Sequence, residues 1–447
     1  MGVEKQYIDL FAQHEALIRK YSPAVMNEFR LRAFEGFQRI GFPSMENEDY
    51  KYTDVQKAFS PDYGVNLNRL AIPFKPEDVF RCDVPNLSTW LYFMVNDSFY
   101  EKGNSCPKLP KSVFVGGFRQ FEEKYPEVAA RYYGKAADFS SEGIVALNTM
   151  LAQDAFVLYV PEGVVLEKPL QLINILRADV DLMVNRRILI IMEPRSEARL
   201  LVCEHSLDKK KFLTTQVVEI FVEEGALLDY YELEETHDLN THFSSVYVEQ
   251  EAKSNVLVNG ITLMNGLSRN NYFIKLNGEY AESTLCGMSI LDKQKHVDVY
   301  SHVTHSVPNC HSTELFKNVL NDQSIGSFCA RILVKKDAQK TRAYQSNRNL
   351  CTSREARMYS KPQLEIYADD VKCSHGMTTG QLDENALFYM RSRGIPESEA
   401  RMMLSVAFTA DVLDHIRLRP LQERLHQLVE KRFRGELATC SGCRICR

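Results

Sequence analysis

The sequence has no run of about 18 consecutive apolar residues, which is the length that a membrane-spanning helix needs. Residues 1–6 lack the apolar stretch of a signal peptide, and Gln6 stands where a myristoylation signal requires Ser or Thr. The 11 cysteines are too sparse over 447 residues for a disulfide framework. We therefore expect a cytoplasmic protein that makes no membrane contact and keeps its thiols reduced, with some of them available as metal ligands.

An excess of positive charge is also missing. The chain contains 54 Lys and Arg against 59 Asp and Glu, and its formal net charge is −5. Binding to nucleic acid without sequence preference needs a dense basic surface that displaces counterions. The locally basic stretch over residues 417–447 is interleaved with acidic residues, as on a solvated helix face. We therefore expect no nucleic-acid partner.

The signature motifs of common enzymes are absent. The sequence has no G-x-x-x-x-G-K-[ST] phosphate loop, no G-x-G-x-x-G fingerprint, no H-E-x-x-H zinc helix and no G-x-S-x-G elbow. We therefore expect that this chain binds no nucleotide and is not an enzyme. Catalytic carboxylates from different coils of a repeat would leave no local motif. A β-helix enzyme acting on carbohydrate, either a hydrolase or a lyase, thus stays an alternative, although such enzymes usually carry an export signal.

The first third of the chain is predicted to form a helical or mixed domain over residues 1–143. Apolar residues recur at helical spacing over 7–19 and 23–40, and Gly41 with the following Phe42-Pro43 supplies a helix stop. From residue 144 the pattern changes to short apolar, β-branched segments separated by Gly, Pro, Asn and charged residues. No long helical pattern interrupts them for some two hundred residues.

A repeat can be counted within this second region. Small residues that open a strand recur with spacings of 28, 28 and 27 residues at Ala198, Ala226, Ser254 and Ala281. A constant period in this range is typical of a solenoid, because each coil must cover the apolar face of its neighbour. A β-sandwich also has closely spaced strands, but it has no reason to keep a constant period. We therefore predict a mainly β protein with a β-helix core over residues 144–380 and two or three short strands in each coil.

Residues 381–435 are predicted to form a C-terminal helical domain. Asp383 is a suitable N-cap for a short helix that Gly394 closes, and Pro396 suits the first turn of the next helix. The last coil of a solenoid would otherwise expose its core, so we expect these helices to cap it. Residues 436–447 are predicted to form a flexible tail.

Cys373 and His375 form the candidate metal-binding pair. The residues before them alternate as in a strand, and if the extended conformation continues, both side chains point the same way with Cα atoms about 6–7 Å apart. A thiolate and an imidazole at that distance can share one soft transition metal. The remaining ligands would come from another chain or from the sulfides of a cluster. The alternative is that Cys373 is a buried small residue and His375 a hydrogen-bonded turn residue.

A second group of candidate ligands contains His296, His302, His305, Cys310 and His311. Their spacing puts His296 and His302 on one face of a strand and His305 on the other, so they do not converge within one strand. Hydrogen-bonded structural histidines are therefore the favoured interpretation.

A third group lies in the tail. Cys440, Cys443 and Cys446 match part of a ferredoxin-type run, C-x2-C-x2-C, without its fourth cysteine. Incidental thiols in a flexible segment are favoured over a dedicated site. A metal-storing or redox protein that uses these three cysteines stays a further alternative.

Several longer motifs resemble the SufD family, whose members are subunits of the SUF machinery for iron–sulfur cluster assembly. The motifs are GFP at 41–43, KYT at 51–53, DAQKT at 337–341 with Gln345 and Asn347, DDVKCSHG at 369–376, GQLD at 380–383, FY at 388–389 and RSRGI at 391–395. They extend over nearly the whole chain, and the Lys-Cys-Ser-His run favours SufD over the related SufB. Tyr50 stands where the family pattern has tryptophan.

The resemblance implies a right-handed parallel β-helix flanked by helical N- and C-terminal parts. It also implies a non-catalytic scaffold that pairs with a SufB-like subunit along the β-helix and docks a SufC-like ATPase through its C-terminal helices. The candidate partner-binding residues are Asp383, Phe388, Tyr389, Arg391 and Arg393. His375, with Cys373 beside it, would face a cysteine of the SufB-like subunit where a transient, shared iron–sulfur cluster forms. Without its partners the chain would expose a β-helix edge, which makes a homodimer plausible.

Overall fold

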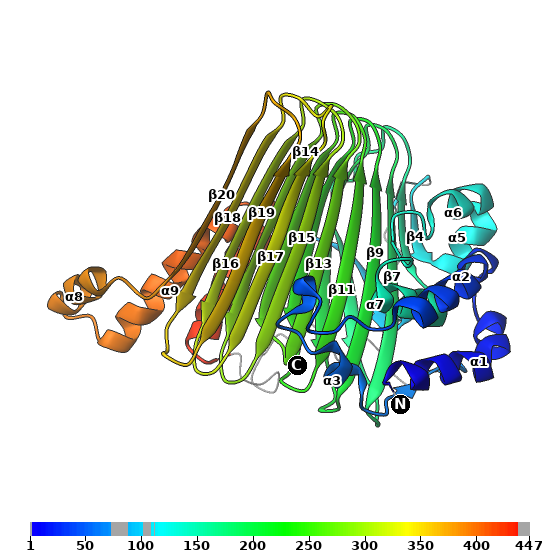
Figure 1. The fold of residues 1–447 in the computed structure, drawn as a ribbon, viewed down its shortest axis with the longest axis horizontal. Coiled ribbons are helices and arrows are strands. Elements are labelled where there is room, and N and C mark those ends of the chain that lie inside the picture. The colour runs from blue at the N-terminus through cyan, green and yellow to red at the C-terminus, as the bar shows by residue number, and fades with distance from the viewer. Residues whose placement is uncertain (1, 73–87, 102–108, 111, 437–447) are drawn as a thin grey trace.

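The centre of the protein is a solenoid of two β-sheets that face each other, each with ten strands. We analysed a computed structural model that describes residues 2–72, 88–101, 109–110 and 112–436. From β5 onward, successive strands alternate between the two sheets, and strands two positions apart in the chain pair in parallel (Figure 1). The prediction of a mainly β protein with a parallel solenoid core and helices at both ends is confirmed.

The two sheets are defined by their strands. Sheet 1 contains β1 (Gly64–Val65), β4 (Phe114–Gly117), β5 (Phe156–Val160), β7 (Leu182–Met192), β9 (Phe212–Val222), β11 (Thr241–Gln250), β13 (Leu267–Leu276), β15 (His296–His305), β17 (Ile325–Val334) and β19 (Arg357–Ile366). Sheet 2 contains β2 (Trp90–Val95), β3 (Ser98–Phe99), β6 (Leu170–Leu176), β8 (Glu197–Ser206), β10 (Leu227–Glu235), β12 (Asn255–Met264), β14 (Glu282–Leu291), β16 (His311–Leu320), β18 (Arg342–Cys351) and β20 (Lys372–Gly380).

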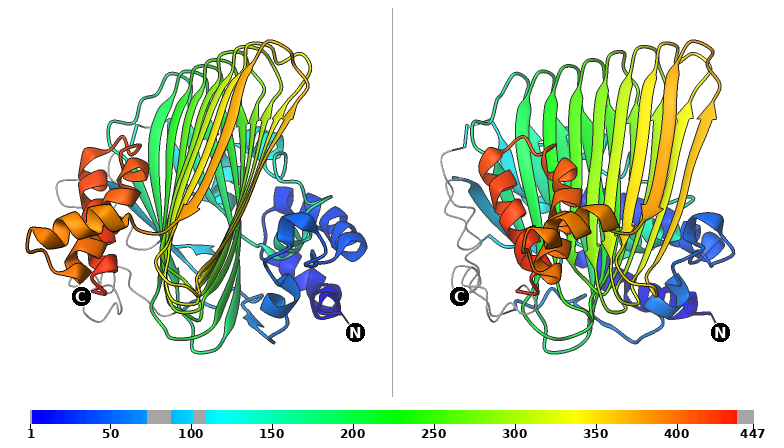
Figure 2. Two further views of the ribbon diagram at one scale, coloured as in Figure 1. Left: turned by 60° about the vertical axis from the view of Figure 1, so that its left-hand side comes forward. Right: turned by 90° about the vertical axis from the view of Figure 1, so that its left-hand side faces the viewer.

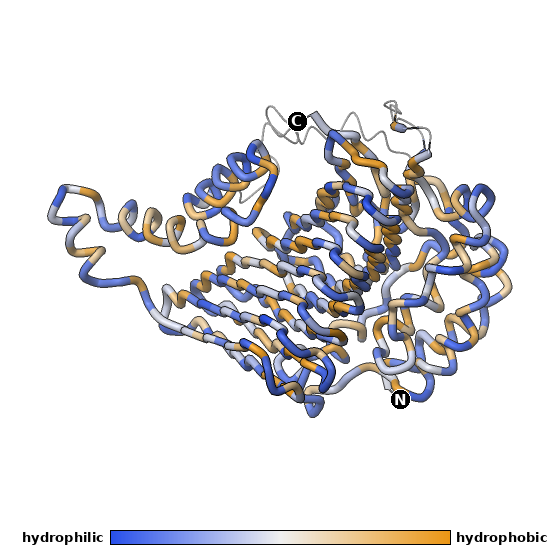
Figure 3. Tube along the Cα trace, turned by 90° about the horizontal axis from the view of Figure 1, so that it is seen from above, coloured by the Kyte–Doolittle hydropathy of each residue, from blue (hydrophilic) through white to orange (hydrophobic). Residues whose placement is uncertain are grey.

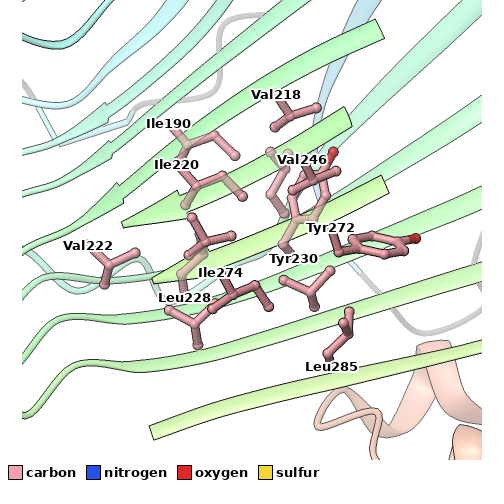
Figure 4. Close-up of a cluster of buried hydrophobic side chains, with 14 of the residues drawn as sticks. Ile190, Val218, Ile220, Val222, Leu228, Tyr230, Val246, Tyr272, Ile274 and Leu285 are labelled. Atoms are coloured by element: carbon pink, nitrogen blue, oxygen red, sulfur yellow. The ribbon is translucent and has the colours of Figure 1, made fainter. Parts of the chain in front are cut away.

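Side chains along each strand alternate between the interior of the solenoid and its outer faces. The interior side chains of both sheets form one apolar core, which includes Ile190, Ile220, Tyr230 and Ile274 (Figure 4). The next residue along a strand points outward, as Tyr231 does toward the C-terminal helices. The alternation is visible as changes of hydropathy along the coils (Figure 3). Each coil therefore covers the apolar face of its neighbours, as the repeat predicted.

The chain passes from sheet 1 to sheet 2 through a corner whose local structure repeats. A residue with positive φ comes first, and a small side chain that is almost fully buried follows it. The positive-φ residues are Arg195, Gly225, Lys253, Tyr280, Asn309 and Lys340, and the small residues are Ser196, Ala226, Ser254, Ala281, Cys310 and Thr341. The N–H of Gly225 donates to the carbonyl of Ala252 in the next coil at 2.8 Å, and most of the other corners repeat this bond. A small residue is needed because the two sheets converge there.

The predicted repeat is right in kind but wrong in detail. Ala198 lies opposite Leu228, and the corner position equivalent to Ala226 belongs to Ser196. From Ser196 to Thr341 the corner residues are spaced by 30, 28, 27, 29 and 31 residues, because the turns differ in length. Each complete coil contains two strands, mostly of 9–11 residues.

The N-terminal helices cover the outer face of sheet 1. They are α1 (Glu4–Lys20), α2 (Ala24–Ile40), the 3-10 helix η1 (Glu48–Tyr50), α3 (Val55–Phe59), α5 (Phe118–Lys124), α6 (Pro126–Tyr132) and α7 (Gly143–Leu151). Their apolar side chains form a second core with outward residues of sheet 1, such as Val217 and Phe243. Near η1, the buried Arg269 binds Asp298 at 2.6 Å and lies over the ring of Tyr50. The helices predicted over 7–19 and 23–40 are confirmed.

The C-terminal helices are α8 (Glu384–Ser392), α9 (Glu397–Leu413) and α10 (Arg419–Phe433). α9 and α10 lie on the outer face of sheet 2, on the side of the solenoid opposite the N-terminal helices (Figure 2). The prediction that these helices cap the last coil is therefore wrong. The physical reason is that the outer face of sheet 2 is itself apolar, with Leu257 and Ile261 packed against Leu421 and Leu425. This face needs a cover, and the helices supply it.

The predicted domain boundaries, at 143/144, 380/381 and 435/436, stay predictions. The predicted tail lies outside the described residues from position 437 onward. Among the described residues, no helix is long and apolar enough to cross a membrane.

Candidate functional site

Cys373 and His375 lie on β20, the last strand of the solenoid. β20 pairs in parallel with β18, and in the described part of the chain no strand pairs with its other edge. The same holds in sheet 1, where β19 pairs only with β17 among the described strands. We call the surface formed by β19 and β20 the open end (Figure 1). The candidate pair therefore lies at an unpaired edge of both the sheet and the solenoid.

Both side chains of the pair belong to the inward-facing row of sheet 2. Cys373 lies opposite Ala343, and His375 lies opposite Gln345, and both of these neighbours are buried in the interior. Cys373 is half-buried against the apolar core, whereas His375 is exposed because no further coil covers it among the described residues. Burial raises the pKa of the Cys373 thiol. A metal that binds this sulfur must therefore displace its proton.

The pair continues a row of polar side chains that leads into the solenoid. Glu314, Gln345 and His375 occupy the same position on β16, β18 and β20. Gln345 Nε2 donates a hydrogen bond of 2.6 Å to Glu314 Oε2, and Ser301 Oγ from sheet 1 donates to the same oxygen at 3.3 Å. Burial raises the pKa of Glu314 to about 7. The interior behind His375 is thus polar and hydrogen-bonded.

A second polar group lies two and four residues further along β18. Asn347 Oδ1 accepts hydrogen bonds from Asn349 Nδ2 at 2.6 Å and from Ser360 Oγ of sheet 1 at 2.8 Å. Asn349 also donates to the carbonyl of Thr378 on β20 at 3.2 Å. These bonds join the two sheets near the open end and fix the backbone of β20 close to His375.

Sequence reasoning named Gln345 only as part of a motif and missed Glu314. One signal was available, since Gln345, Asn347 and Asn349 place polar residues at period two in a strand where an apolar interior face is the rule. Glu314 belongs to another coil and leaves no such local signal.

The second group of candidate ligands does not converge. On β15, His296 and His302 point outward and His305 points inward, as their spacing predicted. His305 Nε2 lies 2.8 Å from Ser312 Oγ, and burial lowers its pKa to about 4. Cys310 occupies a buried corner, and His311 Nε2 lies 3.1 Å from Thr313 Oγ1. Over the described residues, no group of three or more His, Cys, Asp or Glu side chains is placed to hold a metal ion.

A polar chamber with buried acids lies deeper in the solenoid. Its lining includes Glu204, Glu232, Glu234 and His242. Burial raises the pKa of Glu232 to about 7 and that of Glu234 to about 8. The cavity is only about 30 Å³, which admits one or two water molecules and no sugar ring. These carboxyl groups therefore do not form the carbohydrate-binding groove that the β-helix enzyme alternative requires.

Helix α8 carries the candidate partner-binding residues. Asp383 caps its N-terminus by accepting hydrogen bonds from the N–H groups of Asn385 and Ala386. Phe388 and Tyr389 are 73% and 58% exposed, although they are large aromatic residues. Arg393 lies over the ring of Tyr389 at 5.2 Å. Arg391 pairs with Glu397 at 3.5 Å. Figure 1 shows α8 projecting away from the solenoid.

The three tail cysteines, Cys440, Cys443 and Cys446, lie outside the described residues. The structure therefore does not test them as ligands.

Two protein-family models together match most of the chain. Residues 1–172 match the SufBD protein N-terminal region, and residues 175–408 match the SufBD core domain of SUF-system FeS cluster assembly. The chain belongs to the SufBD family. Family membership agrees with the resemblance found from the motifs, and it establishes iron–sulfur cluster assembly as the family's process.

The names of two of the following three similar proteins refer to iron–sulfur cluster assembly. The chain is 26% identical over 94% of its length to an iron–sulfur cluster assembly SufBD family protein of Synechocystis, of which it covers 94%. It is 27% identical over 89% of its length to the iron–sulfur cluster assembly protein SufD of Escherichia coli, of which it covers 90%. It is also 27% identical over 87% of its length to the chloroplastic protein ABCI7 of Arabidopsis thaliana, of which it covers 82%.

Proposed function

We propose that this chain is a non-catalytic scaffold subunit of an iron–sulfur cluster assembly complex, similar to SufD. In this proposal the open end pairs with a SufB-like β-helix subunit, α8 contributes to docking a SufC-like ATPase, and Cys373 and His375 contact the nascent cluster at the subunit boundary. The observation that carries the proposal is the position of both candidate ligands on β20, whose outer edge has no strand partner among the described residues.

The open end has the properties of a pairing surface. An unpaired strand presents a row of N–H and C=O groups that another strand can bind. Over the described residues, side chains of the interior face of the last coil remain accessible, with Met377 46% exposed and Leu364 half-buried. A second solenoid of the same cross-section would extend both sheets and bury these side chains. The same argument favours a homodimer when the partner is absent.

The candidate pair suits a shared cluster better than a resident one. Two protein ligands do not complete the coordination of iron, and no third ligand stands near them in the described part of the chain. In this proposal the cluster is therefore cargo, held jointly with the partner. The half-buried thiol of Cys373 and the exposed imidazole of His375 both remain accessible until the partner covers them.

Cluster reconstitution tests the role of His375. In the complex purified with its partners, we expect His375→Ala to fold normally but to lower the yield of cluster assembled from iron and sulfide, as measured by absorbance and iron content. His311→Ala is the matched control, since it removes a partly exposed histidine from the outer face of sheet 2. Unchanged cluster yield in His375→Ala would remove this residue from the mechanism.

Co-purification tests the two partners. We expect a tagged copy of this chain to recover a second β-helix subunit and an ABC-type ATPase. Phe388→Ala combined with Tyr389→Ala should lose the ATPase and keep the β-helix subunit, because the two proposed contacts lie on different parts of the fold. Tyr280→Ala, which removes another exposed aromatic side chain, is the control. Full recovery of the ATPase by the double variant would exclude α8 as its docking site.

A further inference from the structure

The side-chain amide nitrogen of Gln345 makes a hydrogen bond, whereas its amide oxygen makes none. Its Nε2 donates to Glu314 Oε2 at 2.6 Å, and its Oε1 accepts no hydrogen bond although the side chain is only 3% exposed. A buried amide oxygen without a donor costs free energy, so native structures rarely retain one. The oxygen therefore indicates a donor that comes from elsewhere.

The orientation of this amide is set by Glu314. The hydrogen bond with the Glu314 carboxyl group directs Nε2 toward β16, the preceding strand of sheet 2. Because the nitrogen and oxygen of an amide lie on opposite sides of its carbon, Oε1 is directed away from β16. Ser301 holds the Glu314 carboxyl group from sheet 1, so this orientation has support from both sheets.

His375 is the next side chain in the row beyond Gln345. The two residues are paired in register on adjacent parallel strands, where neighbouring positions lie about 4.8 Å apart. His375 is exposed, so its ring can rotate toward the amide without displacing a packed neighbour. A neutral imidazole has one N–H donor and one bare nitrogen, and the partner of the N–H decides which nitrogen is bare.

We propose that Gln345 Oε1 accepts a hydrogen bond from one ring N–H of His375, and that Glu314 holds Gln345 in the orientation that permits it. Gln345 and Glu314 are then positioning residues. They fix the tautomer of His375 and leave its other nitrogen free, facing the open end, to bind iron. Metal-binding histidines generally need such a partner for the second ring nitrogen. The functional part of this inference rests on the proposed function, whereas the hydrogen bond does not.

Nitrogen NMR of the full chain, labelled at histidine with ¹⁵N and recorded at alkaline pH, tests the hydrogen bond directly. The His375 resonances are assigned by their absence in His375→Ala. In the wild-type protein we expect two well-separated ring nitrogens, one of N–H type and one bare. In Gln345→Met the two shifts should move toward each other, because the two tautomers then exchange. Gln363→Met, which removes a half-buried glutamine from the outer side of the last coil, should leave them unchanged.

A second pair of variants checks the role of Glu314. Glu314→Gln keeps an oxygen that accepts from Gln345 Nε2, so the separation should persist. Glu314→Leu removes the acceptor, so the Gln345 amide can flip and the separation should shrink. Wild-type-like separation in Gln345→Met, or nitrogens already averaged in the wild type, would overturn the inference. The NMR test does not depend on cluster yield. Unchanged cluster yield in His375→Ala would remove His375 from the proposed function, but it would not alter the hydrogen bond that NMR detects.

Discussion

The two ends of the solenoid are built differently. At the N-terminal end both sheets finish with antiparallel strands, since β3 pairs antiparallel with β2 and β4 pairs antiparallel with β5. Asp154 binds the N–H groups of Phe99 and Phe118 there and lies 3.6 Å from Arg69, which fastens the strands to α5. At the open end, β19 and β20 remain parallel, regular and uncovered among the described residues.

This difference distinguishes an end that closes the fold from an end that can continue it. The antiparallel strands β3 and β4 interrupt the parallel register at the N-terminal end, so a further parallel coil cannot be added in register there. A regular parallel edge keeps the register and can accept one. The candidate ligands lie on the edge that can continue. The following predictions test whether residues toward the N-terminal end stabilise the fold, while residues at the open end contribute little to stability and instead contact a partner.

The largest expected effect comes from a buried ion pair between sheet 1 and the N-terminal helices. Glu219 binds Arg187 at 3.0 Å and accepts N–H bonds from Gly134, Ala136 and Ala137 between α6 and α7. Glu219→Ala would leave a buried arginine unpaired, so we expect a loss of about 3–5 kcal/mol in the free energy of unfolding, measured with urea.

The control for Glu219 is an exposed pair at the open end. Glu365 lies 3.3 Å from Arg331, and both side chains are partly solvated. Glu365→Ala should cost about 0–1 kcal/mol. Equal losses at the two positions would contradict the difference between the ends.

Two inward-facing leucines give the next comparison. Leu172 on β6 is fully buried, whereas Leu364 on β19 is half-buried at the open end. Leu172→Ala should cost about 2–5 kcal/mol, and Leu364→Ala about 1 kcal/mol, because the second site can fill with water. Urea unfolding of both variants measures this. A larger loss for Leu364 would mean that the open end is covered in the isolated chain, as a homodimer would do.

A buried acid in the earlier coils predicts that stability depends on pH. The folded state raises the pKa of Glu234 to about 8 from 4.5, so it keeps a proton that the unfolded chain releases. The contribution of Glu234 to the free energy of unfolding is therefore fully present below about pH 4.5. It falls as the pH rises toward 8, by at most about 1.4 kcal/mol per pH unit. Glu234→Gln should reduce that slope in melting experiments across this range. An unaltered slope in Glu234→Gln would refute the assignment.

The sequence predicts the solenoid well because each coil obeys the same local rule. Alternation at period two gives each strand one inward face, and a small residue is needed at every corner where the sheets converge. Cys373 and His375 are two residues apart, so their shared face follows from the strand alone. Counting from Ala198 hides the longer first interval of 30 residues, since Ser196 occupies the corner two residues earlier.

The features that escaped prediction depend on contacts between distant segments. The amphipathic pattern of α9 and α10 shows that one face is buried, but not that it covers the outer face of sheet 2 instead of the last coil. Glu314, Gln345 and His375 meet because β16, β18 and β20 stack in register, at separations of 31 and 30 residues. No local spacing encodes that row, and unequal turns prevent a fixed period from revealing it.

The smallest expected effect on stability tests the open end most directly. Met377 is an inward residue of β20 that is 46% exposed in the isolated chain. Met377→Lys should change the free energy of unfolding by less than about 0.5 kcal/mol, because the charge remains in water. In the proposed complex the same charge would be buried against the second β-helix subunit without a partner, which is costly, so co-purification of that subunit should be lost. Met45→Lys, at a methionine with 50% exposure in the segment between α2 and η1, is the control and should keep it. Recovery of the second subunit by Met377→Lys at the wild-type level would show that pairing uses another surface.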